Sequence, residues 1–413
     1  PRTQAGLGEL PPETTAAGVA GSLPQSISRW AMRGSCFNPM RNTSVPCTRA
    51  NSAIVYAGYD NKPGSLKAEL TVRGNANMGA LCGELEVPFS RCGSLLVTYD
   101  AGAVSRLEKK LENGVRNGVP GLRLLSGPEA EAMEPMLRKG VAAALYAPST
   151  GTVNPWQLGI AAFENALQNG AEAMLNTEVL GIRRTETGYE IETGNETFFC
   201  KTVFNCAGLS ADKVQEMVFA PSVRLRLDGA EYLVFDELAR KPGYIVFDQA
   251  DSCGKGITAI PCTEGNLLIS GVRKPLDVPF ATTVEGLGEL YAATKKLLPD
   301  AQPEMVIRSF GAVRPNPCRE NGESLQDFCI ENPADGFYSL IGIKTPGLTA
   351  SNELGLLLAQ WAANRLGAEK KPGFDPERKA ITEKDNEIIC RCGQITRAEI
   401  LEAIRRGAAT VES

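Results

Sequence analysis

The sequence predicts a two-domain α/β fold in which a helix-covered sheet is interleaved along the chain with a mostly antiparallel sheet. Residues 153–218 show a helix, a short strand, a small meander and a further strand–helix pair, which is typical of an α/β sheet. Residues 222–329 hold several short apolar runs and few helical patterns, which is typical of an antiparallel sheet. Strand and helix patterns alternate again over residues 336–366, so the first domain is completed there.

The bulk composition supports a globular protein and excludes some partners. The chain has 413 residues, of which 43% are hydrophobic and 22% are charged, so it can form two or more domains with sizeable cores. Its net charge is −5 and no strong basic patch is visible, which argues against nucleic acid as a partner. No apolar run approaches the roughly 18–20 residues that span a bilayer. We therefore expect no transmembrane segment and a cytoplasmic protein, with peripheral attachment to a membrane left open.

Cysteine and histidine usage narrows the chemistry. The 12 cysteines form no short, dense framework, which indicates reduced thiols rather than disulfides. The chain has no histidine at all. This excludes a Ser-His-Asp triad, a Cys-His pair, histidine-ligated zinc and an imidazole base. The chemistry must therefore come from a cofactor or from Cys, Lys, Tyr, Arg or carboxylate side chains.

The first 48 residues differ from the rest of the chain. Residues 1–49 hold five Arg, no Lys, no Asp and two Glu, together with six of the 26 prolines. We expect 1–48 to be an irregular or damaged segment.

Residues 16–21 (AAGVAG) are one glycine short of the G-x-G-x-x-G dinucleotide loop. GELPPE before them does not predict a buried strand, and no acid follows until Asp60, so we expect a corrupted loop, with a shifted reading frame as one hypothesis.

From residue 50 onward the elements follow ordinary start and stop signals. The sequence predicts strands over 52–58 and 93–99, separated by a helix over 65–85, and a charged surface helix over 103–117. Ser126, with Pro128 in the first turn, is a plausible helix start. Further helices are predicted over the ranges 155–170, 284–298 and 349–366, and a strand over 202–208.

Four segments occur in an order that points to a known family: ANSAIVYAGYDNKPGSLKA (50–68), STGTVNPWQL (149–158), VFNCAGLSAD (203–212) and GIKTPGLTAS (342–351). Together they resemble the FAD-dependent oxidoreductases of the D-amino-acid-oxidase superfamily. The nearest branch is that of the anaerobic glycerol-3-phosphate dehydrogenases and L-2-hydroxyglutarate oxidases. The resemblance covers about residues 49–368 and implies FAD as cofactor, a Rossmann-like FAD-binding domain and an antiparallel β substrate domain.

The resemblance also implies domain boundaries. The FAD-binding domain is expected over 49–89, 153–220 and 330–368, and the substrate domain over 90–152 and 221–329. A linker is expected over 369–387, followed at 388–413 by part of the small [2Fe-2S] domain that some members of the family carry.

The cofactor contacts implied by the resemblance lie in all four segments. The helix N-terminus at GIKTPGLTAS would lie against the flavin and stabilise negative charge there. Small residues after a strand let a ligand approach the backbone. The implied contacts are Asn51, Ser52, Val179, Ala207, Gly208, Gly342, Gly347, Leu348 and Thr349. The alternative, that these are ordinary strand–turn–helix connections, stays open at this point.

Two residues are implied to act on the substrate. Arg314 in FGAVRPNP corresponds to an arginine that binds the acidic group of the substrate, and its planar fork suits a carboxylate or phosphate. The alternative is a surface arginine. Tyr56 stands where the family commonly has histidine, and a phenol is a poor base at neutral pH. Lys344 is a weaker candidate for an anion or flavin contact.

Near the C-terminus, Cys390 and Cys392 have the spacing of thiolate ligands, but a [2Fe-2S] cluster needs four ligands. We interpret these residues as half of a cluster site, so that a cluster would belong to a full-length form. The alternative is two unremarkable thiols before an amphipathic helix.

The sequence thus favours an FAD-dependent oxidoreductase that takes a hydride from a small anionic alcohol such as glycerol 3-phosphate or a 2-hydroxy acid. Its electrons would pass to an acceptor or partner subunit. One alternative is an inactive relative that keeps the fold without competent FAD binding. Another is an NAD-linked dehydrogenase, which would need a Rossmann start that the sequence does not show.

Overall fold

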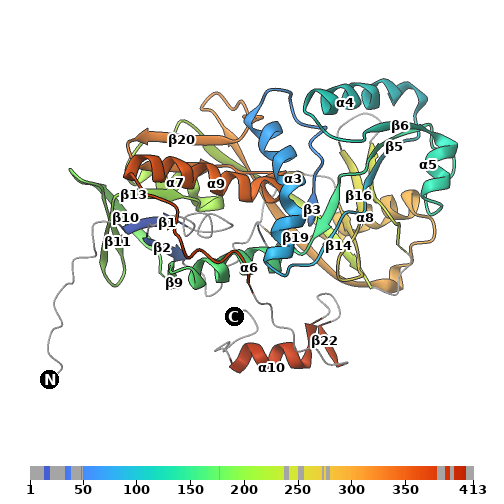
Figure 1. Ribbon diagram of the computed structural model, residues 1–413. Coiled ribbons are helices and arrows are strands. Elements are labelled where there is room, and N and C mark those ends of the chain that lie inside the picture. The colour runs from blue at the N-terminus through green and yellow to red at the C-terminus, as the bar shows by residue number, and fades with distance from the viewer. Residues whose placement is uncertain are drawn as a thin grey trace.

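Two large β-sheets lie beside each other in the computed structural model, joined by helix α3 (Leu66–Glu84) and strand β3 (Ile54–Val55) (Figure 1). The structure describes 14–18, 33–38, 48, 50–175, 177–236, 241–249, 255–271, 274–275, 280–378, 387–390 and 395–405.

The first sheet has six strands, and five of them are parallel. In spatial order it contains β20 (Cys329–Ala334), β21 (Phe337–Ile341), β13 (Thr202–Asn205), β1 (Thr14–Gly18), β2 (Arg33–Asn38) and β9 (Glu172–Leu175). Only β20, at one edge, runs antiparallel to its neighbour. Three separated parts of the chain therefore build one sheet.

Strands β1 and β2 differ from the expectation that 1–48 is irregular. The residues of β1, TTAAG, have no large apolar side chain, so they give a weak strand signal. In the structure β1 pairs in parallel with β13 on one side and with β2 on the other, with Gly18 opposite Asn205. Pairing with neighbours that are distant in sequence therefore decides the conformation here. Residues 19–21 of the predicted loop lie outside the described residues.

Helices pack against this sheet and have identifiable ends. They are α3, α7 (Ala211–Glu216) and α9 (Gly347–Leu366), whereas α6 (Pro155–Gln168) packs against α3 and β3. The Asn154 side chain caps α6 by accepting hydrogen bonds from the backbone N–H groups of Trp156 and Gln157. Gly367 ends α9 in the left-handed conformation, at φ +63°.

A three-stranded antiparallel meander leaves the parallel sheet between β9 and β13. It consists of β10 (Val179–Arg184), β11 (Tyr189–Thr193) and β12 (Thr197–Cys200). Its inner face buries Ile182, Tyr189, Ile191 and Phe198 against Phe337 of β21.

The second sheet has nine strands and is mostly antiparallel. Its order is β18 (Lys274–Pro275), β14 (Arg224–Phe235), β17 (Leu267–Ser270), β16 (Lys255–Pro261), β15 (Ile245–Gln249), β5 (Ser94–Thr98), β7 (Ala143–Ala147) and β6 (Arg123–Ser126), with β19 (Val306–Cys318) paired to β14. Only the β15–β5 pair is parallel.

Three helices accompany the nine-stranded sheet: α4 (Val104–Arg116), α5 (Gly127–Met133) and α8 (Val284–Leu297). Helix α8 packs Leu290 and Leu297 onto the largest core cluster, which includes Leu95, Val246 and Ile269. Helix α5 starts with the predicted Ser126, whose side chain forms a capping box with Glu129. Short 3₁₀ turns occur at Ala101–Ala103, Gly208–Ser210 and Pro303–Met305.

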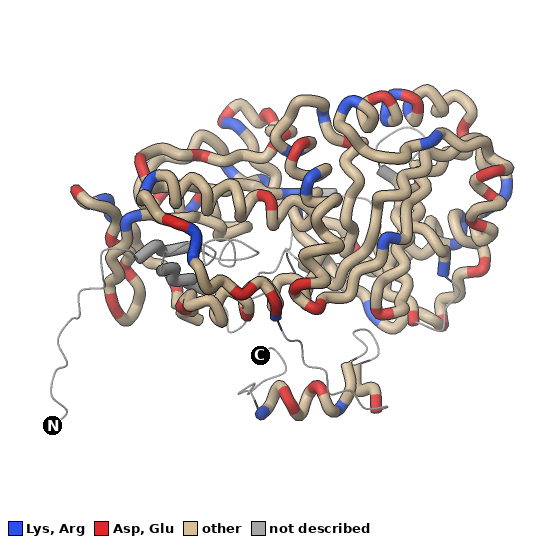
Figure 2. Tube along the Cα trace, viewed as in Figure 1, with Lys and Arg blue, Asp and Glu red and all other residues tan. Residues whose placement is uncertain are grey.

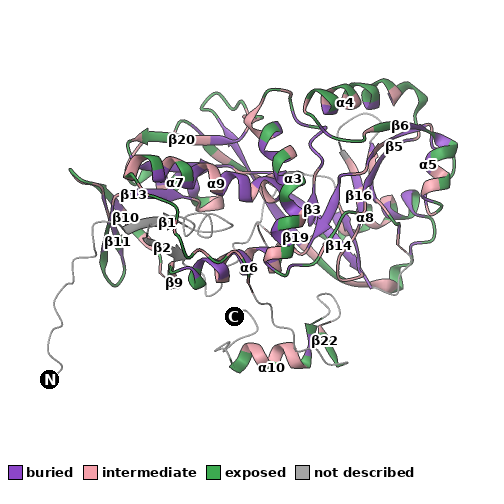
Figure 3. Ribbon diagram, in the orientation of Figure 1, coloured by how far each residue is buried: buried purple, intermediate pink, exposed green. Residues whose placement is uncertain are grey.

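Strand β3 joins the two halves of the molecule. It pairs with β8 (Gly151–Val153), which also pairs with β4 (Phe89–Ser90). Ile54 packs with residues of the nine-stranded sheet, whereas its neighbour Val55 packs with α3 and α6. This strand is fully buried, as Figure 3 shows, so its position is fixed from both sides.

At the C-terminal end, β22 (Ile388–Cys390), β23 (Ile395–Thr396) and α10 (Arg397–Arg405) form a small separate unit. Acidic and basic residues are interspersed along the described chain (Figure 2). Within its described part, the protein has no helix that is both long and apolar enough to cross a bilayer.

The predicted fold class, an α/β domain interleaved with a mostly antiparallel domain, is confirmed. The exact domain boundaries remain a prediction.

The contact between α3 and α9 yields a first test. A Cβ atom added at Gly74 would lie 2.1 Å from the backbone oxygen of Thr349. We expect Gly74→Ala to lower the free energy of unfolding by about 1–3 kcal/mol, since α9 must move away. Gly83→Ala in the same helix is the control, because its Cβ would meet nothing within 4 Å. Equal melting temperatures for the two variants would contradict the tight contact.

Candidate active site

The segment that leads into β3 is held in a tight turn by Asn51. Its Nδ2 donates to the Thr48 carbonyl at 2.6 Å, and its Oδ1 accepts from the Ala53 N–H at 2.7 Å. Ala53 adopts the left-handed conformation, with φ +57°, which is uncommon for a residue with a side chain. The side chain of Asn51 therefore serves its own turn. The Ser52 hydroxyl lies 3.4 Å from the Tyr56 hydroxyl, so these two side chains point toward each other.

Tyr56 and the first turn of α9 are linked directly. The Tyr56 N–H donates to Thr349 Oγ1 at 3.0 Å, and this hydroxyl also lies 3.4 Å from the Ile54 carbonyl. The Tyr56 ring lies 6.1 Å from the ring of Phe247 in the nine-stranded sheet. Tyr56 is thus placed between α9 on one side and the second sheet on the other.

Two glycines, Gly342 and Gly347, allow close packing of the chain at the N-terminus of α9. Gly342 has φ +71°, and a Cβ there would lie 2.5 Å from Pro317. At Gly347 a Cβ would lie 2.8 Å from the Ile343 side chain. Leu348 packs against the cluster around Val55, and Thr349 is fully buried. No side chain caps the N-terminus of α9.

The turn after β13 is ordered by a buried amide. Asn205 donates to the Ala211 carbonyl and to the Ser339 hydroxyl at 2.7 and 2.8 Å, and it accepts from the Ala207 N–H at 3.2 Å. Gly208 follows with φ +58° and open space around its Cβ direction. This turn lies at the end of the strand that pairs with β1.

Arg314 lies on β19 and carries an unsatisfied group. Its Nε is buried and has no hydrogen-bond partner among the described residues. The cross-strand neighbour Asp228 accepts from Asn316 at 2.6 Å and lies 3.7 Å from Arg226 Nε. A buried donor without a partner is costly, and an anion bound at Arg314 would satisfy it.

The register of the strands places Arg314 and Tyr56 toward the same face of the nine-stranded sheet. Side chains two residues apart share a face, so Arg314 faces the same side as Phe310. One cross-strand row on this face contains Phe310, Tyr232, Ser270, Thr258 and Phe247. Because Phe247 lies against the Tyr56 ring, the row leads from the strand of Arg314 to Tyr56.

The other predicted residues lie elsewhere or have other partners. Val179 begins β10 in the meander and packs into its core. Lys344 is buried and its Nζ donates to the Leu325 carbonyl at 2.6 Å. Cys390 ends β22, and Cys392 lies outside the described residues. Within the described ranges, no group of three or more potential ligands is arranged to hold a metal ion.

Sequence reasoning missed several residues around Tyr56. Asn75 donates to the Tyr56 carbonyl, Ser149 has a buried hydroxyl without a partner, and Phe247 packs on the Tyr56 ring. Ser149 belongs to the STGTVNPWQL segment, which was a usable signal. Asn75 and Phe247 stand in an ordinary helix and an ordinary strand, and no local pattern marks them.

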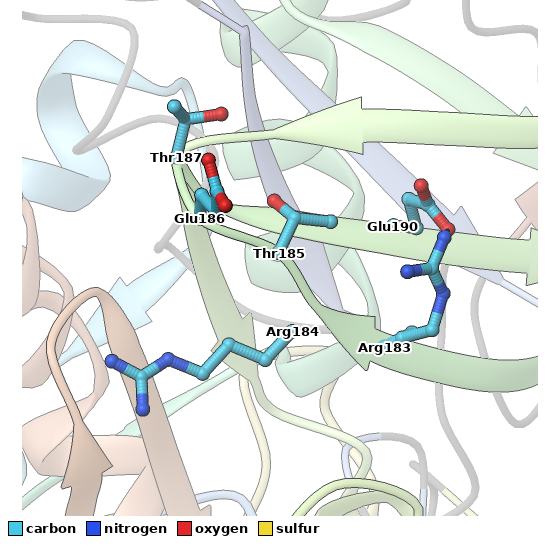
Figure 4. Close-up of a pocket in the computed structure, with 6 residues that line it drawn as sticks. All are labelled: Arg183, Arg184, Thr185, Glu186, Thr187 and Glu190. Carbon is cyan, nitrogen blue, oxygen red and sulfur yellow. Dashed lines mark hydrogen bonds and ion pairs between the residues drawn. The ribbon is translucent and has the colours of Figure 1, made fainter.

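A surface pocket at the β10–β11 hairpin is a separate feature (Figure 4). It is lined by Arg183, Arg184, Thr185, Glu186, Thr187 and Glu190. Arg183 pairs with Glu190, whereas Arg184 extends away from them. None of the predicted site residues lines this pocket.

Comparison with known proteins identifies the family. The pattern of the FAD dependent oxidoreductase (DAO) family matches residues 44–361, which is most of the chain. The chain belongs to this family. It is therefore an FAD-dependent oxidoreductase. The two alternatives raised by the sequence, an NAD-linked dehydrogenase and an inactive relative, are not favoured by this finding.

Individual relatives of this FAD-dependent oxidoreductase are similar over most of their length. A glycerol 3-phosphate dehydrogenase of Caloramator mitchellensis is 35% identical over 423 residues, covering 96% of this chain and 87% of the relative. An L-2-hydroxyglutarate dehydrogenase of Indibacter alkaliphilus is 27% identical, covering 77% and 89%. The FAD-bound L-alpha-glycerophosphate oxidase of Mycoplasma pneumoniae has the same fold, with a TM-score of 0.79, 23% identity, and coverage of 89% and 99%.

The residues around α9 fit the FAD that this oxidoreductase family uses. In addition to the uncapped N-terminus of α9, the Asn352 side chain is only 8% exposed and its Oδ1 is buried without a partner. The Asn352 amide oxygen is thus an unpaired acceptor that a donor group of the cofactor can satisfy.

Two thiols near Tyr56 have raised pKa values. Cys92 and Cys262 pack in the same cluster as Tyr56. Burial raises the pKa of the Cys92 thiol, and it raises the pKa of Cys262 to about 12. A raised pKa keeps both thiols protonated at neutral pH, and the thiolate is the nucleophilic form. We therefore expect both thiols to react slowly with electrophiles at neutral pH.

This conclusion yields a second test. At pH 8 we expect iodoacetamide to alkylate Cys262 roughly 10³-fold more slowly in the folded protein than in guanidinium, because its pKa is about 12 rather than that of a free thiol. Mass spectrometry of tryptic peptides after timed labelling gives both rates. Similar rates in the folded and unfolded protein would contradict the raised pKa of this thiol.

Proposed function

We propose that this oxidoreductase oxidises a small anionic alcohol, with glycerol 3-phosphate as the first candidate substrate. The observation that carries the proposal is the buried, unpartnered Nε of Arg314 on the sheet face that leads to Tyr56. The similarity to a glycerol 3-phosphate dehydrogenase over 96% of the chain supports the choice of substrate. A 2-hydroxy acid is the second candidate, favoured by the similarity to L-2-hydroxyglutarate dehydrogenases.

Arg314 binds the anionic end of the substrate in this proposal. A guanidinium presents parallel N–H donors that match two oxygens of a phosphate or carboxylate. Asp228 is already engaged by Asn316, so its negative charge is partly compensated within the protein. The anion of the substrate would satisfy the donor that the protein leaves unpaired.

Tyr56 holds the alcohol group. Its hydroxyl and that of Ser52 lie 3.4 Å apart, and the pair can accept and donate hydrogen bonds to a substrate hydroxyl. Bound FAD supplies the acceptor for the hydride from the carbinol carbon. Because the chain has no histidine, the protein groups orient and desolvate the alcohol rather than supply an imidazole base.

The cofactor would be held by the turns that meet around α9 and β13. Gly342, Gly347, Leu348 and Thr349 form the α9 approach, and Ala207 and Gly208 form the open turn after β13. Asn51 and Ser52 precede β3, and Val179 would contribute through its main chain. The side chain of Asn51 already satisfies its own turn, so its contribution would also come from the backbone.

Electrons would leave through a separate acceptor or partner subunit. We place the enzyme in a reducing compartment, the cytoplasm, because eight cysteines in the described ranges are free thiols. An iron–sulfur role for Cys390 and Cys392 remains a prediction, supported only by their spacing.

The substrate proposal is tested by anaerobic reduction of the flavin. We expect glycerol 3-phosphate to bleach the flavin absorbance of the FAD-loaded protein, and Arg314→Met to lower kcat/KM about 10- to 100-fold, because a charged hydrogen bond is lost. Arg224→Lys, at a half-exposed surface pair with Glu216, is the control and should leave kcat/KM unchanged. Bleaching by L-2-hydroxyglutarate alone would select the second candidate, and bleaching by neither would reject the proposal.

The role of Tyr56 is tested by restoring the histidine common in the family. We expect Tyr56→His to introduce a rise in kcat with pH, centred near the usual histidine pKa of about 6.5, because neutral imidazole accepts the hydroxyl proton. Tyr56→Phe should lower kcat without such a rise. The measurement is kcat against pH for the three proteins, and identical profiles for all of them would show that position 56 does not contact the alcohol.

A further inference from the structure

A buried asparagine on α3 lies directly behind Tyr56. Asn75 is 4% exposed, and its Nδ2 lies 2.8 Å from the Ser149 carbonyl, 3.1 Å from the Tyr56 carbonyl and 3.4 Å from the Val55 carbonyl. Asparagine is a poor residue for a helix interior, so its presence here needs a reason beyond helix formation.

The carbonyls that Asn75 binds lie where a strand ladder ends. Strand β3 pairs with β8 from Ile54 opposite Thr152 to Val55 opposite Gly151. Tyr56 is the next residue outward on β3, and Ser149 lies two residues beyond Gly151 at the same end of β8. One side-chain amide therefore satisfies both carbonyls at the open end of the ladder and ties the two strand ends to α3.

Arg91 fixes Asn75 in turn. Its Nη1 donates to Asn75 Oδ1 at 3.1 Å and to the Ser149 carbonyl at 2.7 Å, and its Nη2 donates to the Asn75 carbonyl at 3.0 Å. The acceptor oxygen of the amide is thereby assigned to the guanidinium, which leaves the amide N–H groups for the carbonyls of Ser149 and Tyr56.

These contacts close a ring around the Tyr56 backbone. Its carbonyl accepts from Asn75 of α3, its N–H donates to Thr349 of α9, and α3 touches Thr349 at Gly74. Both sides of the residue are thus held by two helices that are themselves in contact. The neighbouring Ser149 hydroxyl is buried without a partner.

We propose that Asn75, held by Arg91, is a positioning residue that fixes Tyr56 and Ser149 relative to the first turn of α9. This inference rests on the proposed role of Tyr56 at the substrate. Displacement of a reacting group by about 1 Å can lower a rate about 100-fold, so loss of this clamp lowers turnover more than it lowers substrate affinity.

The test replaces the amide by an isosteric carboxylate. Asn75→Asp keeps an oxygen for Arg91 but loses the donors to the Tyr56 and Ser149 carbonyls. The matched control is Asn165→Asp on α6, since Asn165 is fully buried and its Nδ2 donates to the carbonyls of Asp375 and Glu377 at 3.0 and 3.3 Å. Both variants should lose similar stability.

Two readouts separate positioning from stability in the FAD-loaded proteins. We expect Asn75→Asp to lower kcat about 10- to 100-fold with KM changed less than about threefold, whereas Asn165→Asp leaves both constants unchanged. Hydrogen exchange should accelerate in peptides that cover 53–57 and 147–150 only in Asn75→Asp. Unchanged kcat and unchanged exchange in Asn75→Asp would overturn the proposal.

If Asn75→Asp does not fold, Thr349→Val and Thr349→Ser test the other side of the ring, because only serine keeps the acceptor for the Tyr56 N–H. Loss of turnover in Thr349→Val with rescue in Thr349→Ser supports the ring, and equal turnover in both overturns it. If the wild type oxidises neither candidate substrate, the proposed function fails, while hydrogen exchange still decides whether the clamp exists.

Discussion

The close approach of α3 to α9 is the constraint on which the candidate site depends. At Gly74 the two helices meet with no space for even a methyl group next to the Thr349 carbonyl. This contact sets where the first turn of α9 begins, and Thr349 then receives the Tyr56 N–H. The uncapped helix end and the tyrosine are therefore positioned by one packing contact rather than by two independent loops.

The second sheet completes the site because β3 belongs to both halves of the molecule. Ile54 is buried in the nine-stranded sheet and Val55 is buried against α3 and α6, so the strand cannot shift toward one domain without losing contacts in the other. Tyr56 follows β3 immediately, so the contacts of β3 also fix the position of Tyr56. Its ring contact with Phe247 then aligns it with the sheet face toward which Arg314 points.

Local patterns in the sequence predicted the elements whose signals are themselves local. Helix α5 follows the predicted start at Ser126, and the predicted ranges 155–170 and 349–366 contain α6 and most of α9. Strands β1 and β2 were not predicted, because these short stretches of mostly small or polar residues form strands through parallel pairing with β13 and β9. The interleaved fold class was nevertheless predictable, since its other strands carry their own apolar patterns.

In the candidate site, local sequence patterns predicted even fewer of the contacts than in the fold. Arg314 and Tyr56 could be named from the motifs that contain them. The unpartnered state of Arg314 Nε could not be predicted, because its cross-strand neighbour Asp228 is hydrogen-bonded to Asn316, which lies 88 residues further along the chain. Asn75 is 19 residues from Tyr56 and 74 from Ser149, and no spacing rule joins them. In the proposed site, which has no histidine, the described groups around Tyr56 would act by orientation. Such a site depends most on residues like Asn75, which shape the backbone and carry no chemistry of their own.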